Sequence, residues 1–213
     1  MQISATHAGA ASFWDKIAQK YAKQPISDPT AYEAKLNRLR ELLRPEDRVL
    51  EIGCGTGSTA LTLAPSVAKM IATDLSREMI AIAQHKRRED ATKVVQFRQA
   101  AADTRLTEAP FDVVMSFSML HLVPDIPAVL DAVFEQTRPG GLFISKTVCM
   151  GDSNPFLRLM VRALHALGFA PKVTVLSKDE LCDAIVAAGF EITESRYFGK
   201  GRLNPFIVAK RPA

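Results

Sequence analysis

An apolar stretch runs directly into three glycines at alternate positions, because residues 49–57 read Val-Leu-Glu-Ile-Gly-Cys-Gly-Thr-Gly. The first half is typical of a buried strand, and residues with helix-forming character follow from Ser58 to Ala64. Glycine lets the backbone approach a ligand where a Cβ atom would collide. A strand, a tight glycine turn and a helix place free N–H groups around a nucleotide-like molecule. The segment therefore predicts an α/β fold that binds a small molecule at the end of its first strand.

Short apolar runs alternate with helical patterns from about residue 48 onward. This alternation predicts a mostly parallel, doubly wound sheet with helices on both faces. Seven strands are expected, at 48–52, 68–73, 93–98, 111–117, 142–148, 190–197 and 206–210, and the last of them is expected to run antiparallel. The expected helices are 58–64, 77–88 with Ser76 as N-cap, 126–137, 155–167 and 178–188 with Ser177 as N-cap.

Composition narrows the class of protein further. The 213 residues suit one domain, with 47% hydrophobic and 23% charged residues as in ordinary soluble proteins. The net charge of +4 is modest and acids interleave with Lys and Arg, so no nucleic-acid partner is expected. Cys54, Cys149 and Cys182 lack metal-binding spacing and indicate free thiols in the cytoplasm. No apolar run is long enough to span a membrane, and residues 1–12 are expected to form a loose tail.

The spacing Glu51-x-Gly53-x-Gly55-x-Gly57 differs from the dinucleotide-binding Gly-x-Gly-x-x-Gly pattern. Asp74 follows at the carboxyl end of the second expected strand, where its carboxylate could accept both hydroxyls of a ribose. The alternative is that Asp74 caps the following helix.

Three later segments occur in a matching order along the chain. They are Ala101-Ala102-Asp103, then Pro110-Phe111-Asp112-Val113-Val114 with Ser116 and Leu120-His121, and finally Arg138-Pro139-Gly140-Gly141. Together with the glycine turn and Asp74, they resemble the motifs of class I S-adenosylmethionine-dependent methyltransferases. The segment from Phe13 to Tyr21 is similar to the N-terminus of the quinone-biosynthesis-like, small-molecule branch.

This resemblance implies a Rossmann-like sheet with S-adenosylmethionine as the cofactor. It implies that Asp103 lies beside the adenine and that Tyr21 closes over the methionine end. The alternative for Asp103 is an exposed loop residue. Phe13, Ile17 and Tyr21 also have the spacing of a helix that docks its apolar face. The cofactor-binding residues that we expect are Tyr21, Glu51, Gly53, Cys54, Gly55, Gly57, Asp74, Leu75, Met79, Ala102, Asp103 and Ser116.

His121 follows the fourth expected strand, near the point where cofactor and acceptor should meet. It is the candidate general base, and the alternative is that it only lines the pocket or hydrogen-bonds a loop. No cluster of acids and His indicates a metal site. Nor does an acid or amide followed by Pro-Pro-aromatic follow this strand, which disfavours methylation of amino groups in nucleic acids.

The expected organisation is one domain with two additions. Residues 1–45 form a helical extension over the cofactor site, and residues 46–213 form the methyltransferase domain. Within the latter, residues 149–176 are an amphipathic insertion that could cover the acceptor, pack on the core or lie on a membrane surface.

The function that we expect is methyl transfer to a small, apolar or amphiphilic acceptor. A catalytically silent cofactor-binding partner subunit and a dinucleotide-dependent oxidoreductase are the alternatives. The acceptor atom and the oligomeric state do not follow from the sequence.

Overall fold

The computed structural model describes residues 5–89, 93–167 and 171–213. Within these residues, a seven-stranded sheet has the order β3-β2-β1-β4-β5-β7-β6. The strands are β1 (Arg48–Ile52), β2 (Lys69–Asp74), β3 (Val95–Gln99), β4 (Phe111–Phe117), β5 (Thr137–Lys146), β6 (Glu191–Arg196) and β7 (Phe206–Lys210). The first five run parallel, and β7 is antiparallel to both of its neighbours. The predicted Rossmann-like sheet with an antiparallel last strand is confirmed.

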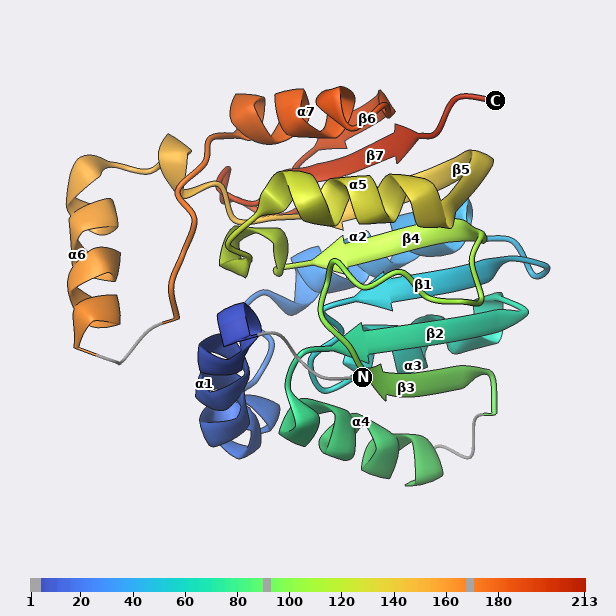
Figure 1. The fold of residues 1–213 in the computed structure, drawn as a ribbon, viewed down its shortest axis with the longest axis horizontal. Coiled ribbons are helices and arrows are strands. Elements are labelled where there is room, and N and C mark those ends of the chain that lie inside the picture. Colours follow the sequence, from blue (N-terminus) through green and yellow to red (C-terminus); the bar gives the residue numbers. More distant parts are fainter. Residues whose placement is uncertain (1–4, 90–92, 168–170) are drawn as a thin grey trace.

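Helices cover both faces of the sheet (Figure 1). They are α1 (Ala5–Ala22), α2 (Pro29–Leu42), α3 (Ser58–Leu63), α4 (Arg77–Glu89), α5 (Ile126–Gln136), α6 (Pro155–Ala166) and α7 (Lys178–Ala187). Three short 3-10 turns complete them, η1 (Ala64–Ser66), η2 (Leu120–Leu122) and η3 (Met150–Asp152). The carboxyl ends of β1 to β4 all point toward α1, and α6 stands apart beyond the same edge of the sheet.

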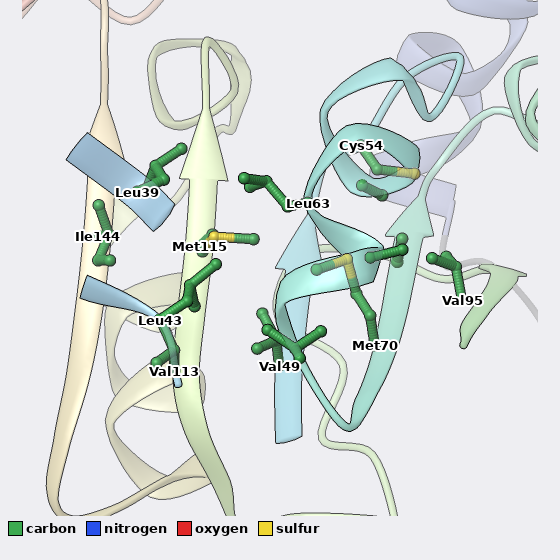
Figure 2. Packing of buried hydrophobic residues seen from close by; sticks show 14 of the residues in the cluster. Leu39, Leu43, Val49, Cys54, Leu63, Met70, Val95, Val113, Met115 and Ile144 are labelled. Atoms are coloured by element: carbon green, nitrogen blue, oxygen red, sulfur yellow. The ribbon is translucent and has the colours of Figure 1, made fainter. Parts of the chain in front are cut away.

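The core consists of two hydrophobic clusters, one on each face of the sheet. Successive side chains of a strand point to opposite faces, so Val49 packs in the first cluster and its neighbour Leu50 in the second. Figure 2 shows the first cluster, in which Leu39 of α2 and Leu63 of α3 pack above the sheet. Residues of α5 and α7 form the second cluster on the other face. The strands are therefore held rigidly, and their carboxyl ends have fixed positions.

The two predicted helix caps are confirmed. The Ser76 hydroxyl accepts a hydrogen bond from the Met79 N–H at 3.1 Å. At α7, the Ser177 side chain accepts from the Glu180 N–H, and the Glu180 carboxylate accepts in return from the Ser177 N–H. Such reciprocal caps satisfy donors that the first helical turn leaves unpaired.

Some boundaries differ from the expectations. Residues 5–12 are not a tail but the first part of α1. The small side chains of Ala11 and Ala18 are buried, and they allow this helix to pack closely. Residues 1–4 of the expected tail lie outside the described part. The strand predicted at 142–148 begins earlier, at Thr137, and ends at Lys146. Its pairing with β4 is irregular at residues 138–141, because Phe111 pairs with Thr137 but Val113 pairs with Leu142. The N–H of Gly140 and the carbonyl of Gly141 both pair with Arg211, at 2.9 Å each. The strand predicted at 93–98 begins only at Val95.

Candidate functional site

A cavity of about 150 Å³ lies at the carboxyl ends of β1, β2 and β4, and α1 contributes to its wall. Eight of the predicted cofactor-binding residues line it, namely Tyr21, Gly53, Gly55, Asp74, Leu75, Met79, Ala102 and Asp103. They come from four separate segments of the chain. The sheet topology therefore brings most of the sequence-predicted site together at one edge, where open α/β sheets bind their ligands.

The three glycines of the turn have different functions. All have positive φ, at +69° for Gly53, +54° for Gly55 and +76° for Gly57. A Cβ atom on Gly53 would lie 2.3 Å from Cγ of Met119, and one on Gly57 would lie 2.6 Å from the Phe97 ring. A Cβ on Gly55 would meet only Tyr21, at 3.9 Å. Gly53 and Gly57 thus permit close packing within the protein, and Gly55 has the open space that the sequence predicted for a ligand.

Asp74 joins the glycine turn to the start of α4. One carboxylate oxygen accepts from the Gly55 N–H at 2.8 Å, and the other accepts from the Ser76 N–H at 2.9 Å. Burial raises the pKa of Asp74, and these two hydrogen bonds oppose the rise by stabilising the charged form. Each carboxylate oxygen has a second lone pair. Asp74, which lines the cavity, therefore still has acceptor capacity for hydroxyl groups.

Helix α1 is attached to the site through polar contacts. Asp15 accepts from the Ser76 hydroxyl at 2.5 Å and from the Glu78 N–H at 3.1 Å, so it caps α4 from outside. Nε2 of His7 lies 3.9 Å from a carboxylate oxygen of Asp103 across the cavity wall.

Tyr21 lies at the end of the same helix. Its ring packs edge-on against Trp14, with centroids 6.1 Å apart, and both residues line the cavity. Burial, together with the nearby Asp74 carboxylate, raises the pKa of the Tyr21 hydroxyl. The hydroxyl therefore stays protonated at neutral pH and can donate a hydrogen bond. The two expectations for this segment, a docked helix and a residue facing the cavity, are compatible.

Glu51 lies behind the cavity wall and not in it. Its side chain is 2% exposed and interacts electrostatically with Lys35 of α2, which is also buried. Burial raises the pKa of Glu51 and lowers that of Lys35, while their mutual attraction opposes both shifts. The Lys35 ammonium also lies 4.4 Å from the centroid of the Phe117 ring, and Phe117 lines the cavity. The pair therefore supports the site from the α2 face.

Three further predicted residues do not line the cavity. The side chain of Cys54 points into the core, as Figure 2 shows, and burial raises its pKa well above the usual value. Gly57 begins α3 as its N-cap. Ser116 is fully buried, and within the described residues its hydroxyl has no hydrogen-bond partner.

His121 also lies outside the cavity lining, although its neighbours Leu122 and Val123 belong to it. Its side chain is 8% exposed, and burial lowers its pKa to about 4. Its carbonyl accepts from the Thr174 N–H at 2.7 Å, and Nδ1 has no partner within the described residues. The imidazole is therefore neutral at physiological pH and a weak base. A role as general base stays a prediction.

Several parts of the cavity wall have no clear signal in the sequence. His7 and Ala10 lie in the segment expected to form a tail, because no strong cap or apolar periodicity marks them as helical. Ser118 and Met119 also line the cavity, where the chain turns after β4. Ser118 has φ +55°, which is uncommon for a residue other than glycine, and no sequence signal announced that turn.

The described residues contain neither a candidate transmembrane helix nor a candidate metal site. None of the helices found there is long and apolar enough to cross a bilayer. In the same part of the chain, no three His, Cys, Asp or Glu side chains gather in a way that could hold a metal ion.

The fold and the site define a doubly wound α/β protein with a small-molecule cavity at its strand ends, of the type found in class I methyltransferases. Residues 21–195 match a protein family described as a methyltransferase domain. The chain therefore belongs to this methyltransferase family, which confirms the resemblance that the glycine turn and Asp74 first indicated.

Individual proteins extend this comparison. The chain is 30% identical over 156 residues to a ubiquinone biosynthesis O-methyltransferase of Paracidovorax citrulli, which covers 70% of this chain and 65% of that protein. Magnesium protoporphyrin IX methyltransferase of Synechocystis PCC 6803, solved with bound SAH, has a TM-score of 0.74 at 14% identity, covering 96% of this chain and 99% of the other. The [4+2]-cyclase SpnF has a TM-score of 0.76 at 18% identity, covering 100% and 98%. At these identities the two structures show the fold alone, and the cyclase shows that this fold hosts other reactions.

Proposed function

We propose that this protein transfers a methyl group from S-adenosylmethionine to a small, apolar or amphiphilic acceptor. The observation that carries the proposal is the pairing of Gly55 with Asp74 at the carboxyl ends of β1 and β2. The open space at Gly55 and the spare acceptor capacity of Asp74 fit a ribose-bearing cofactor. Membership of the methyltransferase family supports the same conclusion.

The cofactor roles that we propose are those that the family resemblance implies, and Tyr21, Asp74, Ala102 and Asp103 all line the cavity. Asp74 would accept from the ribose hydroxyls, Asp103 and Ala102 would lie beside the adenine, and Tyr21 would lie at the methionine end. Glu51 would influence the cofactor site electrostatically, from its buried position behind the cavity wall. When bound, the cofactor supplies an activated methyl group. The protein then has to orient the acceptor and exclude water, and the aromatic side chain of Trp14 contributes to that enclosure.

The acceptor is inferred from the relatives. The curated relative is named as an O-methyltransferase of ubiquinone biosynthesis, and this supports an oxygen acceptor. Because the match covers less than two thirds of that protein's length, its substrate is not carried over. We further propose that residues 1–45 cover the cofactor, that residues 149–176 contact the acceptor, and that the protein acts in the cytoplasm without a nucleic-acid partner.

Calorimetry with S-adenosylhomocysteine and with NAD tests the cofactor. Tight binding of the first and none of the second is expected, and the reverse result would refute the proposal. Asp74→Ala and Gly55→Val should abolish binding, because one removes the acceptor and the other fills the open space. Gly140→Val is the matched control: Gly140 also has positive φ but lies away from the cavity, with nothing within 4 Å of an added Cβ.

A screen of hydroxylated acceptors for released S-adenosylhomocysteine tests catalysis. Turnover with a hydroxyl-bearing acceptor supports the proposal. Cofactor binding without turnover on any acceptor would favour the catalytically silent partner subunit instead.

A further inference from the structure

A second cavity, of about 320 Å³, lies between α6 and the segment that returns from it. Its basic side chains are Arg158 and His165 of α6 and Lys172 of the returning segment. We propose that this cavity binds an anionic group, a carboxylate or phosphate, on the acceptor molecule. The inference rests on the proposed function and deepens it, because it makes the acceptor an amphiphilic anion.

The charge of the lining residues is the first reason to expect an anionic ligand. None of the described residues that line the cavity is acidic, and the positive charge there comes from Arg158 and Lys172. Nε of Arg158 is buried, and within the described residues it has no hydrogen-bond partner. A buried donor left unpaired is destabilising, because it has lost its hydrogen bond to water without replacement. An anion that accepts from the guanidinium removes this cost and gains a charge-assisted hydrogen bond.

The rest of the lining is apolar. It comprises Met150, Val161, Val173 and Val175. An inorganic ion would leave these side chains without contacts, whereas the hydrocarbon part of an organic anion would bury apolar surface against them. The combination of basic and apolar walls therefore favours an organic anion with an apolar body.

The position of the cavity connects it to the proposed methyl-transfer site. Thr174 lies between the two lining valines, and its N–H donates to the His121 carbonyl at 2.7 Å. The Thr174 hydroxyl donates to the carbonyl of Val123 at 2.9 Å, and Val123 lines the first cavity. Residues that line the two cavities thus belong to one hydrogen-bonded pair of segments. Figure 1 shows α6 beyond the edge of the sheet at which β4 ends. An acceptor anchored by its anion at α6 has its other end near the cofactor site.

The test uses matched ligands and the protein saturated with S-adenosylhomocysteine. Octanoate, octyl phosphate and octan-1-ol are titrated by calorimetry. We expect at least one of the two anions to bind tenfold or more tightly than the alcohol, and whichever anion binds identifies the preferred group. Equal affinities for all three ligands would overturn the inference.

Variants locate the binding. Arg158→Gln and Lys172→Gln should each weaken anion binding at least tenfold while leaving the affinity for S-adenosylhomocysteine unchanged, which also shows that the variants fold. Arg88→Gln, which removes an exposed cation on α4, is the control and should change neither. Anion binding that both cavity variants retain would refute the site.

A lipid headgroup shares the chemistry of these anions, so a separate experiment with lipid vesicles distinguishes it from an acceptor. Arg158-dependent sedimentation with phosphatidylglycerol vesicles, without binding of octanoate or octyl phosphate, would assign the cavity to a lipid and overturn its role in acceptor binding. The proposed function fails separately, if the unaltered protein does not bind S-adenosylhomocysteine at all.

Discussion

The buried imidazole of His121 should make the stability of this protein sensitive to mild acid. The pKa of His121 is lowered to about 4 in the folded protein, against about 6.5 in an unfolded chain. Between these values protons bind the unfolded state preferentially, so the stability associated with neutral His121 is fully present above pH 6.5 and is lost as the pH falls toward 4. At pH 5, which is about 1.5 units below the pKa of the unfolded state and still above that of the folded state, the loss is about 2 kcal/mol.

The assay is urea unfolding at pH 7 and pH 5 for the unaltered protein and for His121→Gln. The variant should lose about 2 kcal/mol less than the unaltered protein when the pH falls, since glutamine binds no proton. Comparing the two pH-induced losses cancels any constant cost of the substitution. Val186→Gln, at an exposed position on α7 that carries no ionisable group, is the control and should leave the pH dependence unchanged. Equal losses in His121→Gln and the unaltered protein would show that the burial argument is wrong.

The same shift determines what His121 can do in catalysis. If it acts as a general base, the acid limb of kcat against pH should lie near pH 4. A limb near the ordinary histidine value that persists in His121→Gln would assign the ionisation to another group. Retained kcat in His121→Gln over the whole pH range would identify His121 as a structural residue.

Other perturbations separate packing from ligand space. Gly53→Ala should destabilise the protein by roughly 2–4 kcal/mol, because a Cβ would overlap Met119 and φ is positive; a loss below that of Gly55→Ala in urea unfolding would contradict this. Gly55→Ala should lower the free energy of unfolding by only about 1 kcal/mol, because φ is positive there. The same variant should weaken S-adenosylhomocysteine binding in calorimetry, and unchanged affinity would argue against a ligand at this glycine. Asp15→Ala should lower the free energy of unfolding by about 1 kcal/mol, because the hydrogen bonds that Asp15 accepts from Ser76 and Glu78 are lost. Amide exchange in α1 should become faster, and unaltered exchange would mean that other contacts hold the helix.

Much of the fold follows from local signals in the sequence. β4 was predictable because its near-continuous apolar run is typical of a strand buried on both faces, and α7 because Ser177 and Glu180 form a capping box. The start of α1 was not predictable in this way. That helix depends on long-range contacts of Asp15 and His7 with residues far along the chain, and no short-range pattern records such contacts.

The candidate site shows the same division. Asp74 could be located because a carboxylate at a strand end after a glycine turn has few other uses. The different functions of Gly53 and Gly55 could not be predicted from the sequence. They depend on whether Met119 or open space lies opposite each backbone position. The burial of His121 was equally hidden, since the backbone at Thr174 that pairs with it lies far along the chain.

The attachment of α1 to α4 determines where the chain can be cut to produce a fragment that still binds its ligand. The family match begins at residue 21, so a fragment cut at that boundary would keep the sheet but lose Asp15, His7 and Trp14. The start of α4 would then lack its external carboxylate, and the cavity would open directly to water on that side. Such a fragment could fold and still fail to hold its ligand. We therefore expect the functional unit to be longer than the region that the family match delimits.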